Sequence, residues 1–344
     1  MSQIQSFLQF KSELVGKVAL HSITTVLLIT FLCGCASSPS LAERERIEIR
    51  VDQITPETCQ KEMISFLDIG HRPSWEKKEI NKAQNYLEDR IEQLGYRVER
   101  EPLLGLMRQD YGNANLIFEK TGTRYPHQIL EISAHFDYLD NLGADDNASG
   151  VIGVLEIARI LQNLNLEKTI RFCLFDCEEV GLLGSEHHVT KILEDTEREV
   201  VALINFEMIG YTSTASDSQD APLRIPFIAD LPRIGDFILV AGNFSSGWLG
   251  NLIERNMDVY EPELKYYSAN RIAGFFADAA RSDHSPYWAE GIDAIMLTDT
   301  ANFRNPHYHE DSDTIDTLDF EFMARIIRAV AACAIDWAVL SKAP

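Results

Sequence analysis

The stretch that decides the fold class is QILEISAHFDYLDNLGADDNASGVIGVLEIARILQNLNLEKTIRFCLFD, residues 128–176. Its two ends, 128–136 and 169–176, are apolar runs with the length and composition of buried strands. Between them, residues 148–164 carry apolar side chains at helical spacing. A strand, a helix and a second strand in this order predict two parallel strands joined by a crossover helix.

The same alternation continues on both sides of this unit. Further strands are predicted at 96–101, 113–120, 200–206, 236–241 and 294–298, and helices within 57–95 and at 185–194, 245–255 and 318–340. Strands that alternate with helices form a mostly parallel sheet with helices on both faces. Because we find no linker long enough to separate two domains, we predict a single α/β domain.

The charge of the chain argues against one large class of partner. The sequence holds 53 acidic and 31 basic side chains, a formal net charge of −22 at pH 7. Such a surface repels phosphate backbones and anionic lipid headgroups, so we expect no nucleic-acid partner. The oligomeric state is not indicated by any pattern in the sequence.

The first residues have the pattern of a targeting segment. Lys11 and Lys17 precede an uncharged, mostly apolar run over 18–32, and small residues follow it. A membrane-spanning helix needs about 20 apolar residues, whereas this order of basic, apolar and small residues is typical of a secretory signal. We therefore expect a signal peptide over residues 1–35 and an exported protein, with an uncleaved anchor as the alternative.

The end of this segment, Leu32-Cys33-Gly34-Cys35, resembles the lipobox of bacterial lipoproteins. The resemblance implies that Cys35 becomes the lipidated first residue of the mature chain, although Cys33 departs from the usual small residue at its position. Residues 36–55 would then be a tether and residues 56–344 the folded domain. The expected location is a membrane-tethered lipoprotein that faces the periplasm or the cell exterior.

Side chains that can bind metal follow the predicted strands where they end. The carboxyl ends of parallel strands meet at one edge of a sheet, and functional groups of open α/β folds collect there. In chain order these side chains are His135 and Asp137, Asp145 and Asp146, Glu178 and Glu179, Glu207, and His309, which follows Tyr308. We expect them to lie close together.

Imidazole and carboxylate groups without thiolate suit Zn²⁺. The groups are too many for one tetrahedral ion, so we predict two zinc ions, an arrangement known from hydrolases. Of the adjacent pair Glu178 and Glu179, one carboxylate can bind metal while the other accepts a proton from water. Asp137 is suited to accept the other ring N–H of His135 and to fix its tautomer.

Five segments, in this order and at these intervals, resemble the M28 family of zinc metallopeptidases, in particular aminopeptidases related to bacterial leucine aminopeptidases. They are HFDYLDNLGADDNASG, CEEVGLLGS, NFEMIG, SDHSPYWAEGI and NPHYHEDSDT. The resemblance spans about residue 113 to the C-terminus. It implies a single three-layer α/β/α domain around a mixed, mostly parallel central sheet, in agreement with the strand pattern.

The resemblance also implies roles for individual residues. His135 and Glu207 would bind one zinc ion, Glu179 and His309 the other, and Asp146 would bridge both. Glu178 would be the general base and then acid, and Tyr308 would donate a hydrogen bond to the developing oxyanion. The best-described aminopeptidases of the family have Asp where this chain has Glu207. The resemblance therefore does not fix the spacing of the metal ions or the coordination geometry at Glu207.

The activity implied is the release of N-terminal residues from peptides with a free N-terminus. Two alternatives are weighed against it: a glutaminyl-cyclase-like aminoacyltransferase with a single zinc ion, and a non-catalytic ectodomain that has kept the fold. Outside the proposed ligands, we expect structural roles. Asp283 and His284 could line the site, but we expect them to cap a helix or make structural hydrogen bonds. His188 would lie on a solvated helix face, and Cys173 would pack in the core.

Overall fold

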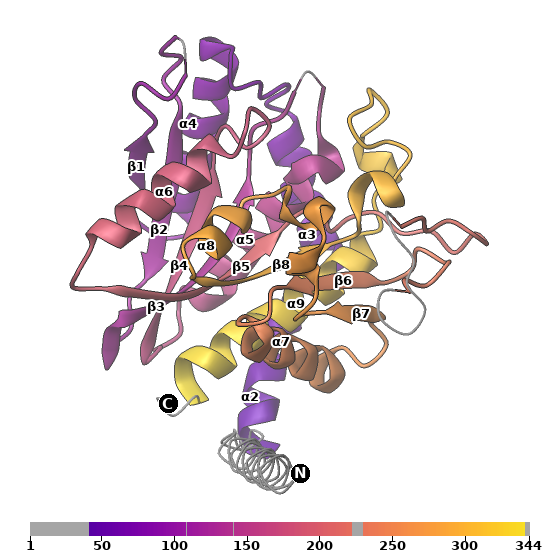
Figure 1. Cartoon of the computed structure of the whole chain (residues 1–344). Coiled ribbons are helices and arrows are strands. Elements are labelled where there is room, and N and C mark those ends of the chain that lie inside the picture. The colour runs from indigo at the N-terminus through magenta and orange to yellow at the C-terminus, as the bar shows by residue number, and fades with distance from the viewer. Residues whose placement is uncertain (1–40, 108, 140, 222–229, 341–344) are drawn as a thin grey trace, which may run out of the picture. The chain divides into compact units, whose positions relative to one another are not determined.

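Eight strands form one mixed sheet in the part of the chain that the computed structural model describes, residues 41–340 except 108, 140 and 222–229 (Figure 1). The order across the sheet is β1-β2-β4-β3-β5-β8-β6-β7. The strands are β1 Glu99–Pro102, β2 Ala114–Lys120, β3 Tyr125–His135, β4 Lys168–Phe175, β5 Glu199–Phe206, β6 Ile238–Gly242, β7 Tyr266–Ala269 and β8 Asp293–Thr298.

The centre of the sheet is parallel. β3 pairs with β4 on one side and with β5 on the other, and β5 pairs with β8, all in parallel register. β6 and β7 are also parallel to each other, whereas β1–β2, β2–β4 and β6–β8 are antiparallel pairs. The predicted mixed, mostly parallel sheet is confirmed, and the carboxyl ends of β3, β4, β5 and β8 lie at one edge.

Helices cover both faces of this sheet. One large apolar core joins the sheet to α3 (Pro56–Leu67), α4 (Lys77–Gln93), α5 (Gly150–Leu161), α7 (Gly247–Tyr260) and α9 (Phe320–Ile335). A smaller core on the other face contains Val189 of α6 (Leu183–Glu194) and Tyr287 of α8 (Ser285–Ala289). The predicted three-layer α/β/α domain is therefore confirmed (Figure 1).

The part of the expected tether that the structure describes, residues 41–55, is instead part of the domain. Residues 41–51 form helix α2 (Leu41–Val51), which contacts α9, and Ile47, Val51 and Ile54 are buried in the main core. Within this charged helix, Ile47 and Val51 are buried whereas Leu41 and Ile49 are exposed, so two apolar side chains are enough to attach it. The proposed signal peptide and Cys35 lie outside the described residues.

The helical region predicted over 57–95 is two helices. Between α3 and α4, Gly70 has a φ of +88° and allows the chain to turn, and residues 68–76 run across to the sheet edge. The short edge strand β7 was not predicted. Within the described residues, no helix combines the length and the apolar character needed to cross a membrane.

Candidate metal centre

The predicted ligands come together at the edge of the sheet where β3, β4, β5 and β8 end. They form two groups, His135 with Glu178 and Glu207, and Asp146 with Glu179 and His309, and within each group the potential ligand atoms lie within 4.8 Å of one another. Asp146 faces both groups, because its Oδ1 is 3.4 Å from His135 Nε2 and its Oδ2 is 3.1 Å from His309 Nε2. A bridging carboxylate needs this placement.

His135, the last residue of β3, is oriented by its neighbours. Its Nδ1 lies 3.1 Å from the backbone oxygen of Asp137 and 3.6 Å from the Asp137 carboxylate. Its Nε2 is buried, has no hydrogen-bond partner among the described residues, and points to Asp146 and to Glu207 Oε2, which is 3.6 Å away. A buried imidazole nitrogen without a partner, surrounded by carboxylates, suits a metal ion.

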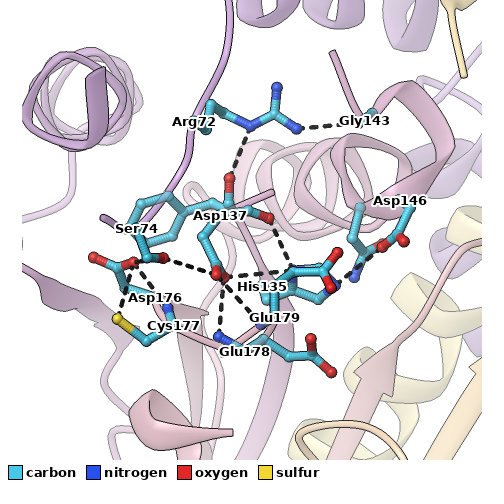
Figure 2. A network of polar contacts seen from close by, with 12 residues as sticks. Arg72, Ser74, His135, Asp137, Gly143, Asp146, Asp176, Cys177, Glu178 and Glu179 are labelled. Atoms are coloured by element: carbon cyan, nitrogen blue, oxygen red, sulfur yellow. Dashed lines mark hydrogen bonds and ion pairs between the residues drawn. The ribbon is translucent and has the colours of Figure 1, made fainter. Parts of the chain in front are cut away.

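Asp137 connects His135 with the two glutamates of the centre (Figure 2). Its Oδ1 accepts a hydrogen bond from the backbone N–H of Glu178 at 3.1 Å, and its Oδ2 accepts from that of Glu179 at 3.3 Å. The hydroxyl of Ser74 donates to the same carboxylate at 2.8 Å. The sequence-based role for Asp137 is thus extended: it holds His135 mainly through its carbonyl and holds the two glutamates through its carboxylate.

The loop before α5 turns Asp146, not Asp145, toward the ligands. The Asp145 carboxylate is directed away and accepts hydrogen bonds from the Gly210 N–H at 2.9 Å and the Asn305 side chain at 2.7 Å. The Asp313 carboxylate accepts hydrogen bonds from the backbone N–H group of Asp145 at 2.8 Å and from that of Asp146 at 3.1 Å. Sequence reasoning missed Asp313, although it lies in the motif that contains His309.

The carboxyl groups of the centre repel one another. Burial and the neighbouring Asp146 carboxylate raise the pKa of Glu179 to about 7. Burial, with the Glu207 and Asp283 carboxylates nearby, raises the pKa of Glu178 well above its ordinary value. Such a cluster is costly without a cation, and a divalent ion would compensate it. The donor set therefore fits zinc.

The longer side chain of Glu207 is held by a relay of hydrogen bonds. The Ser282 hydroxyl donates to Glu207 Oε2 at 2.6 Å and accepts from the Asn205 side chain at 2.9 Å. The Ser133 hydroxyl in turn donates to Asn205 at 2.7 Å. Glu207 thereby presents the oxygen closest to His135 in a fixed position, which a flexible glutamate would not do alone.

Tyr308 lines a cavity of about 360 Å³ and lies next to His309 in the sequence. Their rings stack with 3.8 Å between centroids. Burial alone lowers the pKa of His309, but its hydrogen bonds to Asp146 and Glu179 raise it to about 10. The cavity joins the Asp146, Glu178, Glu179, Glu207 and Tyr308 side chains to an apolar lining that includes Leu239, Tyr267, Ile272, Phe276 and Met296.

Of the remaining predictions, those for Asp283 and His188 need correction, and those for His284 and Cys173 are confirmed. Asp283 does not cap α8, whose first residues have no side-chain cap, but is buried near Glu178. His284 makes a structural contact, 2.7 Å from the backbone oxygen of Ala279. His188 is not solvated but buried, 3.1 Å from Glu101 and 3.2 Å from Glu131. Cys173 packs in the smaller core as expected.

The comparisons with known proteins agree with this geometry. The model of peptidase family M28 matches residues 115–334. The uncharacterized protein YfbL of Escherichia coli (strain K12) is 31% identical over 315 residues, 86% of this chain and 88% of that protein. Aminopeptidase YwaD of Bacillus subtilis (strain 168) is 27% identical over 235 residues, 67% of this chain but only 46% of that protein.

Solved structures share the fold. The LapA aminopeptidase of Legionella pneumophila has a TM-score of 0.70 at 21% identity and covers 90% of this chain and 78% of its own. A glutaminyl cyclase of Bacteroides thetaiotaomicron has a TM-score of 0.61 at 18% identity, over 84% of this chain and 99% of its own. With a family match across more than half of the sequence and a relative similar along most of its length, this chain belongs to peptidase family M28 and is a metal-dependent peptidase.

Proposed function

We propose that the protein is an aminopeptidase that uses two zinc ions to release N-terminal residues from peptides. The observation that carries the proposal is the position of Asp146, whose two oxygens face His135 and His309 in two separate groups of ligands. His135, Asp146 and Glu207 would hold one ion, and Asp146, Glu179 and His309 the other.

Bound zinc would polarise the peptide carbonyl and lower the pKa of water. Glu178 would accept a proton from the attacking water and deliver it to the leaving amine. Burial suits it to this task, because it raises the pKa of the carboxyl group well above its ordinary value, and a raised pKa favours a group that first accepts and then returns a proton. The Tyr308 hydroxyl would donate a hydrogen bond to the carbonyl oxygen as its charge increases.

The cavity supports the choice of an aminopeptidase. Acidic groups beside the metal positions can hold the ammonium group of a free N-terminus, and Glu207 and Glu178 both line the cavity. Apolar side chains such as Ile272, Phe276 and Met296 line it as well. We expect them to receive an apolar side chain of the first substrate residue.

The test combines metal analysis with two substrates. The zinc-loaded full chain should contain two zinc ions and hydrolyse leucyl peptides, while their N-acetylated forms should not react. Glu178→Gln should bind zinc but lose activity by roughly 10²–10⁴-fold. Equal rates on the free and acetylated peptides would contradict an aminopeptidase, and full activity of the variant would contradict the base.

The single-zinc aminoacyltransferase remains the second candidate because its fold is shared. The two complete groups of ligands argue against a single-zinc enzyme, because one zinc ion would leave the three ligands of the other group without a metal ion. One zinc ion per chain, together with cyclisation of N-terminal glutaminyl peptides, would favour this candidate. A chain that binds no zinc would favour the non-catalytic ectodomain.

We also propose that the protein is an exported lipoprotein anchored through Cys35. The proposal rests on the order of basic, apolar and small residues before Cys35. The wild-type chain should fractionate with membranes and incorporate labelled fatty acid, and Cys35→Ala should do neither. Labelling of the variant equal to that of the wild type would exclude this anchor.

A further inference from the structure

A basic side chain in the cavity has no part in the mechanism proposed above. Arg281 lines the cavity and directly precedes Ser282. The other charged residues in the described lining are all acidic: Asp146, Glu178, Glu179, Glu207 and Asp278. Within the described lining, Arg281 is therefore the one site where an anionic part of a substrate would be attracted.

Arg281 is oriented but not neutralised. Its Nη1 donates to the Asn302 side chain at 2.9 Å, and its Nη2 donates to the Tyr308 hydroxyl at 3.2 Å. A guanidinium has five N–H donors, so three remain available. Among the described residues, the hydrogen-bond partners of Arg281 are the neutral side chains of Asn302 and Tyr308 and no carboxylate forms an ion pair with it, and its side chain is exposed to the solvent.

The geometry points to a carboxylate on the leaving side of the scissile bond as the partner of this guanidinium. We propose that Arg281 binds this carboxylate and thereby makes short peptides, dipeptides above all, the preferred substrates. The inference rests on the proposed function, because it takes the Tyr308 hydroxyl as the group that contacts the scissile carbonyl.

The distances in a dipeptide fit this placement. The Arg281 guanidinium lies one hydrogen bond beyond the Tyr308 hydroxyl. In a dipeptide the carboxylate carbon follows the scissile carbonyl carbon after three bonds, a path of about 4.3 Å. A substrate whose carbonyl oxygen contacts Tyr308 can therefore reach Arg281 with its carboxylate, and the planar guanidinium can bind both carboxylate oxygens.

The charge of the protein explains why such a substrate needs a local cation. With a formal net charge of −22, the molecule repels an anionic group that approaches the cavity. The ammonium end of a short peptide is attracted to the acidic side chains of the lining, whereas Arg281 is the one side chain of the described lining that attracts its carboxylate end. A long peptide with a neutral leaving side gains nothing from this contact, so Arg281 would select for length.

The experiment varies both the carboxylate of the substrate and the side chain at position 281. The zinc-loaded full chain and its Arg281→Gln variant are assayed on Leu-Gly, Leu-Gly-amide and Leu-Asp-amide, and kcat/KM is measured for each pair. Tyr308→Phe serves as the control, because it removes the neighbouring hydroxyl and leaves the guanidinium. Thermal unfolding confirms that the variants are folded, as expected for a change at an exposed position.

We expect the wild type to prefer Leu-Gly over its amide by about tenfold or more, as charged hydrogen bonds of this kind allow. In Arg281→Gln the ratio of kcat/KM for Leu-Gly to that for Leu-Gly-amide should fall to about one. The loss of the hydrogen bond to Tyr308 can change both rates, but it should not change their ratio. In Tyr308→Phe both rates should fall and the preference should stay. A preference for Leu-Asp-amide that Arg281→Gln also abolishes would show that a side-chain carboxylate can occupy the same position.

Two results would overturn the inference. If the wild type cleaves all three peptides equally well, or if its preference persists in Arg281→Gln, then Arg281 does not bind the carboxylate, while the aminopeptidase activity stands. If none of the three peptides is cleaved in the presence of zinc, the proposed function itself fails and the inference fails with it.

Discussion

Two clusters of histidine and carboxylate, one fully buried and one partly exposed, lie on different parts of the sheet, and only the partly exposed one is suited to bind metal. The metal centre contains His135 and His309. The second cluster contains His188, placed between Glu101 and Glu131, with the Cys173 sulfur 3.7 Å from its Nε2. By residue type and spacing, Glu131, Cys173 and His188 could also hold an ion.

The partners of the two histidines separate the clusters. Both ring nitrogens of His188 face carboxylates, and Glu131 is further bound by Arg171 at 3.0 Å and by the Tyr287 hydroxyl at 2.7 Å. Its charges are balanced without an ion. In the metal centre, carboxylates outnumber cations, His135 Nε2 has no hydrogen-bond partner among the described residues, and the carboxylates line a cavity. Uncompensated charge with access to solvent, more than ligand type, marks the functional cluster.

The largest expected difference follows from removing one carboxylate from the metal centre. Asp146→Asn should abolish binding of two zinc ions and lower activity by about 10³-fold or more. The metal-free variant should differ little from the metal-free wild type in stability to urea, because the loss of the Asp146 pairs with His135 and His309 is offset by weaker repulsion on Glu179. A large loss of stability in the metal-free protein would mean that Asp146 is a structural residue.

The matching change in the second cluster should have the opposite pattern. His188→Gln removes the cation that Glu101 and Glu131 share, and it should lower the free energy of unfolding by about 3–5 kcal/mol. Zinc content should not change. Cys173→Ala is the control, because it removes a neutral neighbour and should cost less than His188→Gln. Loss of zinc in His188→Gln would show that the second cluster binds metal.

The pH dependence of stability tests the charge balance of the second cluster. Burial alone would raise the pKa of Glu131, but His188 and Arg171 outweigh it and hold the pKa at about 2. A lowered pKa means that the stabilisation is present above the unfolded value of about 4.3 and is lost as the pH falls toward 2. The difference in unfolding free energy between the wild type and Glu131→Gln, on the order of 3 kcal/mol, should therefore shrink from pH 5 to pH 3. A constant difference would contradict a charged Glu131.

The smallest expected effect comes from removing the hydrogen bond that holds the metal ligand Glu207. Ser282→Ala removes the hydrogen bond to Glu207 Oε2 and should weaken zinc binding by about tenfold, as other partners of metal ligands do. Competition with a chelator measures this change, and thermal unfolding of the metal-free protein should hardly differ from that of the wild type. Unchanged zinc affinity would show that Glu207 is positioned without the relay.

Local patterns in the sequence predicted the strands of the sheet centre and the residues at their ends. The apolar runs of β3, β4 and β5 are long and regular, and parallel topology then brings His135, Glu179 and Glu207 to one edge. Edge strand β7 has only four residues, too few for a periodic signal. The roles in zinc binding and catalysis stay predictions.

The partners of the site could not be predicted, because they come from distant parts of the chain. Ser74 contacts Asp137 across 63 positions, and Asp313 contacts Asp145 across 168. Nothing in the neighbouring residues of either side chain indicates these contacts. His188 was misplaced for the same reason, since its helix is polar and its buried partners lie on β1 and β3.

Arg72, a fully buried residue of the segment between α3 and α4, sets the boundary of the smallest working enzyme. It donates to the carbonyl oxygens of Phe136, Leu142 and Gly143, at 2.8, 2.7 and 3.1 Å, and so ties the loop between His135 and Asp146 to a part of the chain far upstream (Figure 2). Trimming the gene to the stretch that carries the family signature, residues 115–334, would remove this anchor together with Ser74. The catalytic unit and the sequence signature of the family therefore have different lengths.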